Sequence, residues 1–134
     1  MYIVVCLDTT GGILFNNRRQ SRDSVIVNDI VNMAGEKLYM SEYSKKLFKD
    51  FDGITVGEEF PFTYDEGAYC FAECEIPEEA VDKAEGFVIY HWNKLYPQDV
   101  SFDISLVKNN FKLESSEDLV GTSHDKITKE IWKK

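Results

Sequence analysis

An unbroken apolar run, YIVVCL at residues 2–7, is followed by the turn sequence DTTGG at residues 8–12. A continuous apolar run that ends in a turn indicates a buried strand, because a strand with one face in water alternates apolar and polar residues. Further stretches of strand length follow at residues 37–40, 53–56, 68–73 and 86–92. Strands of this kind indicate an α/β fold in which helices cover the sheet.

Helical spacing of apolar residues fills the intervals between these strands. Residues 23–35 (DSVIVNDIVNMAG) form the clearest case, with Ser21 or Asp23 as the N-cap and Gly35 as the stop. Two shorter helices are expected at residues 41–51 and 77–84. The first half of the chain therefore alternates strands with helices.

After Pro97 the pattern changes to extended segments without helices between them, at residues 100–106, 111–115 and 127–132. Residues 13–21 are expected to be loop, and residues 115–126 are expected to contain the loop of a hairpin. Together these patterns predict one domain over residues 1–134, a three-layer αβα sandwich around a mixed sheet with a C-terminal β-hairpin. A free edge strand near residues 53–57 would allow a homodimer.

Composition restricts the partners and the compartment. The 134 residues carry a formal net charge of -9, which argues against nucleic acid as a partner because phosphate neutralisation needs excess Lys and Arg. The cysteines Cys6, Cys70 and Cys74 form no disulfide framework, as is typical of a reducing compartment. No apolar run is long enough to span a bilayer, and the first residues lack the positive flank of a secretion signal. We therefore expect a cytoplasmic protein without a membrane partner.

Within this acidic chain, the stretch GGILFNNRRQSRD concentrates three arginines, Arg18, Arg19 and Arg22. An arginine fork binds phosphate or carboxylate, and the helix expected next has N-terminal amides that favour anions. The stretch therefore predicts a site for a phosphate-bearing small molecule or for the acidic surface of a partner protein. Alternatively, the arginines pair with the chain's own carboxylates, such as Glu42 or the acidic residues between 58 and 85.

Three further residues are candidate ligand contacts. Asn17, next to the arginines, offers an amide to a ligand or simply forms a turn with Asn16. Trp92 and Tyr96 follow the strand expected at residues 86–92 and could line a pocket for a planar ligand. The alternative for both aromatic residues is a place at the edge of the core.

Two other groups of residues predict neither a metal site nor a catalytic triad. Cys70 and Cys74 lie roughly 13 Å apart on a strand, too far to share one ion, so we expect both to face the core and predict no metal site. His124 stands between Ser123 and Asp125, but sequence neighbours rarely present the geometry of a Ser–His–Asp triad. That segment is expected to be the hairpin loop.

The order of elements resembles dihydrofolate reductase. The strand ending at Asp8 and the following GGILF are similar to that family's opening strand and mobile substrate loop. The other similar segments are GEKLYMSEYSKKLF, AYCFAEC, KAEGFVIYHWNKLYPQDVSFDI, FKLESSEDLVG and KITKEIWKK, which correspond to the later strands, their helices and the C-terminal hairpin. The resemblance covers nearly the whole chain and implies a dihydrofolate reductase-like fold.

The same resemblance implies what remains of the family's active site. A carboxylate near the start of the first helix holds and protonates the pterin in that family, and Asp23 occupies this place. Asp23 is therefore the candidate catalytic residue, with helix capping as the alternative role. Glu42 stands where the family has a phosphate-binding arginine, and Ala72-Glu73 where it has a glycine pair. We expect no NADPH, no other cofactor and a binding role; a residual pterin or folate reductase using Asp23 as acid is the alternative.

Short bacterial proteins with segments like LFNNRRQSRD, WNKLYPQD and TSHDKITKE are very similar to this chain, and they often carry the name ribonuclease Z. The ribonuclease Z family binds two zinc ions through a His-x-His-x-Asp-His run and further histidines. Only His91 and His124 exist here, far apart in sequence, so the zinc ligand set is missing. The sequence therefore argues against a nuclease, which stays the third candidate function.

Overall fold

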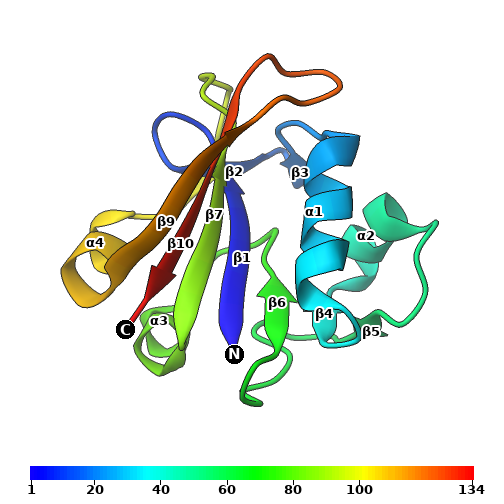
Figure 1. Cartoon of the computed structure of the whole chain (residues 1–134), viewed down its shortest axis with the longest axis vertical. Helices are drawn as coiled ribbons and strands as arrows, with labels where there is room; N and C mark the ends of the chain where they lie inside the picture. Colours follow the sequence, from blue (N-terminus) through cyan, green and yellow to red (C-terminus); the bar gives the residue numbers. More distant parts are fainter.

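A seven-stranded mixed sheet runs through the centre of the protein, whose computed structural model describes all 134 residues (Figure 1). The strand order is β5–β4–β6–β1–β7–β10–β9. Its strands are β1 (Tyr2–Leu7), β4 (Leu38–Met40), β5 (Thr55–Val56), β6 (Tyr69–Phe71), β7 (Gly86–His91), β9 (Lys112–Leu119) and β10 (Ile127–Lys133). Strands β5, β4, β6, β1 and β7 pair in parallel, whereas β10 pairs antiparallel with β7 and β9. The expected α/β class and the C-terminal hairpin are confirmed.

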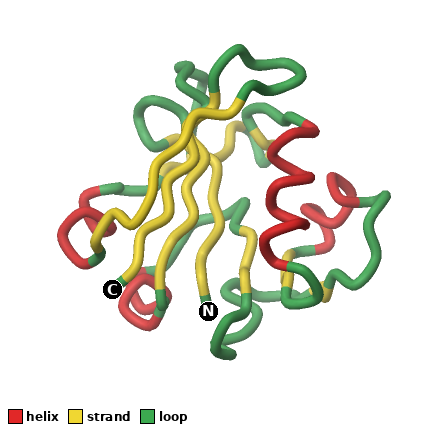
Figure 2. Tube along the Cα trace, in the orientation of Figure 1, coloured by secondary structure: helices red, strands yellow, loops and turns green.

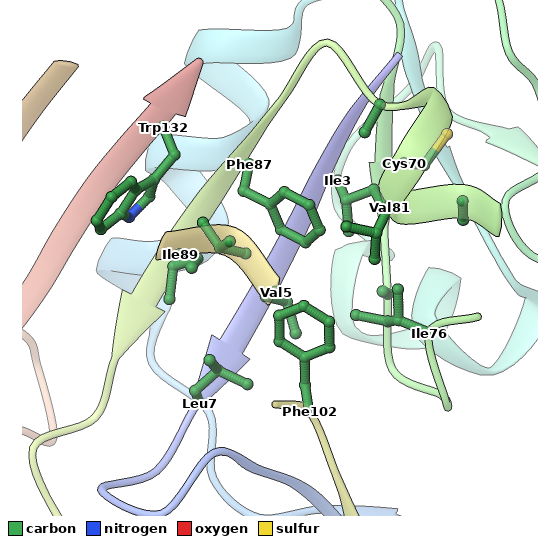
Figure 3. Close-up of a cluster of buried hydrophobic side chains, with 14 of the residues drawn as sticks. Ile3, Val5, Leu7, Cys70, Ile76, Val81, Phe87, Ile89, Phe102 and Trp132 are labelled. Atoms are coloured by element: carbon green, nitrogen blue, oxygen red, sulfur yellow. The ribbon is translucent and has the colours of Figure 1, made fainter. Parts of the chain in front are cut away.

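Strand β1 lies between β6 and β7, and its side chains contribute to two hydrophobic clusters. Ile3, Val5 and Leu7 belong to one cluster and Val4 to the other, all with no exposed surface. Figure 3 shows the first of these clusters, where Phe87 of β7 packs beside them. The continuous apolar run thus reflects a strand that is buried on both faces.

Helices cover both faces of this sheet (Figures 1 and 2). Helix α1 (Ser24–Ala34) packs on one face together with α2 (Glu42–Lys45) and the short 3₁₀ helix η1 (Lys46–Phe48), whose Phe48 is fully buried. Helices α3 (Glu78–Lys83) and α4 (Ser105–Asn110) contribute Ala80, Val81 and Val107 to the cluster on the opposite face. None of these helices is long and apolar enough to cross a membrane.

A second, three-stranded sheet shows that the expected loop at residues 13–21 is wrong. It consists of β3 (Arg18–Arg19), β2 (Gly12–Phe15) and β8 (Val100–Ser101), in that order. Strands β2 and β3 form a hairpin closed by Asn16 and Asn17, with φ of 52° and 61°. Positive φ at both central residues is the geometry of the tight turn that matches strand twist, and asparagine tolerates it well. The two asparagines therefore fold this hairpin and place Arg18 and Arg19 on a strand.

The expectation that residues 100–106 are extended is wrong for the second half of this segment, because helix α4 (Ser105–Asn110) begins at Ser105. The apolar residues Ile104, Val107 and Phe111 recur at helical spacing and pack against the core cluster. Two other boundaries differ: the helix expected at residues 41–51 ends at Phe48, and β9 continues to Leu119. Strand β5 does lie at the edge of the large sheet, and a homodimer through it stays a prediction.

Candidate functional site

The three arginines have different environments. Arg19, on β3, forms a bidentate ion pair with Glu73, with Nε and Nη2 at 2.7 and 2.9 Å from its carboxylate oxygens. The Arg19 guanidinium also lies 4.5 Å above the ring centre of Tyr43. Arg18 and Arg22 are exposed and form no ion pair. Pairing with the chain's own carboxylates, one of the two alternatives, is therefore confirmed for Arg19 alone.

Glu73 follows β6 and is almost completely buried, with 7% of its side chain exposed. Besides Arg19, it accepts a hydrogen bond of 2.8 Å from the Ser44 hydroxyl. Burial lowers the pKa of Arg19, but the hydrogen bond and charge of Glu73 outweigh it and raise that pKa. The positive charge of Arg19 thus offsets the negative charge of the buried Glu73 carboxylate.

Asp23 is the N-cap of α1, which is one of the two roles expected for this residue. Its buried carboxylate accepts five hydrogen bonds: from the amides of Val25, Thr122 and Ser123, the Thr122 hydroxyl and His124 Nδ1. Burial raises the pKa of Asp23, but the hydrogen bonds from His124 and the backbone outweigh it and hold that pKa well below its usual range. The carboxylate is therefore ionised at neutral pH and holds no proton to give to a pterin.

His124 joins Asp23 to residues on the other side of its ring. An ionised carboxylate only accepts, so His124 Nδ1 donates to Asp23 Oδ2 at 2.9 Å. In the neutral ring, Nε2 then accepts from the Ser21 hydroxyl at 2.9 Å and faces the Tyr96 hydroxyl at 3.3 Å. The indole of Trp92 stacks on the imidazole with ring centres 4.6 Å apart. Ring tautomer and ring orientation are thus both fixed.

A second buried carboxylate, Asp8, holds the neighbouring segments in place. It accepts from the Thr10 amide and hydroxyl and the Gly12 amide, and also from Gln20 Nε2 at 2.9 Å and the Tyr96 amide at 3.3 Å. Burial raises the pKa of Asp8, and these hydrogen bonds more than compensate, so that the pKa is lowered. Asp8 therefore connects the end of β1 to the segments that carry Ser21 and Tyr96.

Two open grooves meet at the arginines. The first, which we call the arginine groove, has a volume of about 460 Å³ and is lined by Arg18, Arg19, Ser21, Arg22 and Tyr43. The second, the adjoining groove of about 470 Å³, shares Arg18 and Arg19 and extends to Gln20 and Tyr96. No carboxylate lines either groove. In a chain with 24 Asp and Glu residues, this surface is distinctly cationic.

Below the arginine groove lies a small pocket of about 20 Å³, with mostly apolar walls that include Trp92 and Phe48. That volume holds about one water molecule. Cys6 lines the same pocket, and its burial raises the pKa of the thiol far above the usual range, so it is an unreactive wall.

The structure brings most of the expected site residues together. Arg18, Arg19, Arg22 and Tyr96 line the grooves, and Asp23 and Trp92 lie directly beneath. Asn17 lies in the β2–β3 turn and lines neither groove. Of the cysteines expected in the core, Cys70 is buried whereas Cys74 is half-buried.

Sequence reasoning missed two residues of this site. Ser21 was expected only as a helix cap, and His124 was weighed with its neighbours Ser123 and Asp125 and assigned to a loop, yet Ser21 and His124 form a hydrogen bond across 103 positions of sequence. No local pattern signals such a contact. The other histidine, His91, forms a separate contact with Glu130 at 2.6 Å.

No protein-family model matches this chain, and a search of the curated proteins also finds no match. The function must therefore be inferred from the geometry and charge of the site.

Proposed function

We propose that this protein is a dihydrofolate reductase-like protein without an NADPH site, which binds a small anionic or nucleotide-like ligand in the arginine groove. The observation that carries the proposal is the absence of any carboxylate from a groove with two unpaired arginines, in a chain of net charge -9. Arginines left without internal partners in such a chain have an external anion as their natural partner.

The proposed fold is a three-layer αβα sandwich of the dihydrofolate reductase type. Its support is the run of parallel strands β5, β4, β6, β1 and β7 followed by the antiparallel β10–β9 hairpin, with helices on both faces. Figure 1 places the arginine-bearing strand β3 beside the start of α1, where the resemblance puts the substrate cleft.

The proposed loss of the NADPH site is supported by the residue that replaces the family's glycine pair. Glu73 projects a carboxylate into the cleft, where Arg19 and Ser44 hold it in place. A fixed carboxylate at this point repels a pyrophosphate and occupies the space that its close approach to the backbone would need. Asp23, held ionised by five hydrogen bonds, likewise lacks the proton that a reductase would use.

The position of the anion follows from Asp23 as well. Its carboxylate already caps α1 by accepting from the Val25 amide, so the helix amino terminus is not open to a ligand. The anion is therefore expected to bind the Arg18 and Arg22 side chains, because the Ser21 hydroxyl already donates to His124. A groove of about 460 Å³ is in the range of small-molecule sites.

A thermal-shift panel tests this proposal with inorganic phosphate, nucleotides, folates and NADPH as probes. A ligand at 100 times its Kd stabilises the folded state by about 2.7 kcal/mol, which corresponds to roughly 10 °C in a chain of this length. We expect phosphate-bearing probes to raise the melting temperature of the wild type and of Lys108→Ala/Lys112→Ala. The latter variant removes two exposed cations outside both grooves, so its net charge matches that of the test variant.

The test variant is Arg18→Ala/Arg22→Ala, which leaves the Arg19–Glu73 pair intact. The proposal is supported if phosphate-bearing probes stabilise the wild type and Lys108→Ala/Lys112→Ala but do not stabilise Arg18→Ala/Arg22→Ala. Stabilisation by both NADPH and a folate would support the residual reductase instead. If no probe stabilises the wild type, the small-ligand proposal fails and an acidic partner protein is left as the occupant.

A further inference from the structure

The side chains beneath the arginine groove are arranged as in a nucleophilic hydrolase. Ser21 Oγ lies 2.9 Å from His124 Nε2, and His124 Nδ1 lies 2.9 Å from Asp23 Oδ2. These are the contacts of nucleophile with base and of base with orienting carboxylate that define a Ser–His–Asp triad on any fold. The three residues come from the segment before α1 and from the β9–β10 loop, so chain order is no guide to them.

We propose that Ser21 is a nucleophile, with His124 as its general base and Asp23 as the positioning residue, and that the groove hydrolyses a small carboxylic ester. This activity goes beyond ligand binding. It depends on the triad contacts and not on the anion site, although an anionic substituent on the ester would be held by Arg18 and Arg22 if the proposed function holds.

The burial of each member fits its role. His124 and Asp23 have 3% and 0% of their side chains exposed, so water does not compete for the hydrogen bond between them. Ser21 is half-buried and lines both the arginine groove and the small pocket, so a molecule in either space lies beside this residue. Trp92, stacked on the imidazole, keeps the ring from rotating away from Ser21.

The reaction follows from these positions. Ser21 Oγ attacks the carbonyl carbon of the ester while its proton passes to His124 Nε2, and the bond from that carbon to the leaving oxygen then breaks as His124 protonates the departing alcohol. Water attacks the acyl-serine next, gives its proton to His124, and releases the carboxylic acid as Ser21 Oγ regains a proton.

The pocket below Ser21 restricts the acyl group. Its volume of about 20 Å³ accepts a group the size of one water molecule, such as the methyl of an acetyl group. The proposed substrate is therefore an acetyl ester, with its methyl group in this pocket.

The test uses p-nitrophenyl acetate, a neutral acetyl ester, with intact-mass measurement and peptide mapping of the full chain. We expect one acetyl group on Ser21 of the wild type and none at this position in Ser21→Ala. The matched control is Ser24→Ala, because Ser24 is exposed and bonds only to the side chain of Thr122 and to Asn28, so this variant must still be acetylated at Ser21. His124→Gln should slow acetylation of Ser21 by about 10²-fold or more, as expected for loss of a general base.

A wild type acetylated only on lysines, or acetylation of Ser21 at the same rate in folded His124→Gln, would overturn the proposal. If circular dichroism shows that His124→Gln is unfolded, the comparison of the wild type with Ser21→Ala and Ser24→Ala decides alone. Because the probe is neutral, Arg18→Ala/Arg22→Ala should still become acetylated. Acetylation of Ser21 in a wild type that binds no phosphate-bearing probe would therefore refute only the proposed function, and binding of such a probe by a wild type that is not acetylated at Ser21 would refute only the nucleophile.

Discussion

Replacing the Asp23 carboxylate by an amide tests how far this buried group organises the site. In Asp23→Asn the amide oxygen can take the place of Oδ1 and keep the bonds from Val25 and Thr122. The amide nitrogen then stands at Oδ2, where it faces two donors, the Ser123 amide and His124 Nδ1. The imidazole can change tautomer to accept from the new amide, but the Ser123 amide loses its partner.

The magnitude follows from these losses. A hydrogen bond to a charged group contributes about 1.5–3 kcal/mol, and a buried donor without a partner costs about 1–3 kcal/mol. We therefore expect Asp23→Asn to lower the free energy of unfolding by about 3 kcal/mol at pH 7, equivalent to roughly 10 °C in melting temperature. Asp125→Asn is the matched control, because Asp125 is exposed two positions from Ser123 and should change stability by less than about 0.5 kcal/mol.

The loss of stability in Asp23→Asn must also depend on pH. The folded-state pKa of Asp23 lies below its unfolded value near 3.9, so the carboxylate stabilises the protein above that pH, and this contribution is lost progressively as the pH falls below it. The stability difference between wild type and Asp23→Asn should therefore be constant from pH 7 to about 5 and smaller at pH 3. Urea unfolding followed by tryptophan fluorescence measures it. Equal unfolding midpoints at pH 7, or a difference that is as large at pH 3, would refute this reasoning.

Three further predictions concern the surroundings of the site. Glu73→Gln leaves Arg19 half-buried without a counter-charge and should reduce the unfolding free energy by about 2 kcal/mol in urea. Gly121→Ala should cost about 1–3 kcal/mol by the same assay, because the added Cβ would overlap the Asp23 carboxylate; an unchanged midpoint would contradict this. Burial raises the pKa of Tyr90 far above its usual range, so Tyr90→Phe should not change the phenolate absorbance of the native protein at pH 11. A lower absorbance should appear in that variant only after unfolding.

The strands and helices of the large sheet could be predicted because their signals are local. The unbroken run of β1 and the periodicity of α1 between Asp23 and Gly35 each decide their own element. Helix α4 was missed because the apolar residues of 100–106 (VSFDISL) alternate with polar ones, which is the pattern of a strand, and this segment runs into the start of the helix.

The site was only half predictable for a related reason. The arginines could be singled out because three of them lie within five positions of an acidic chain, and Trp92 and Tyr96 because they follow an expected strand. Their partners depend on tertiary contacts: Glu73 lies 54 positions from Arg19, and His124 lies 103 positions from Ser21. A single sequence does not contain these distances, so neither the neutralisation of Arg19 nor the base beside Ser21 could be derived from it.

An NMR titration with inorganic phosphate and a nucleoside monophosphate tests the central claim most directly. Backbone amide shifts of ¹⁵N-labelled protein report where the anion binds, whatever its effect on stability. The account predicts saturable shifts confined to residues 18–22, 43 and 96, which line the two grooves, and their loss in Arg18→Ala/Arg22→Ala. Shifts concentrated on β9 or α4, or shifts at the grooves that persist in the double variant, would contradict it.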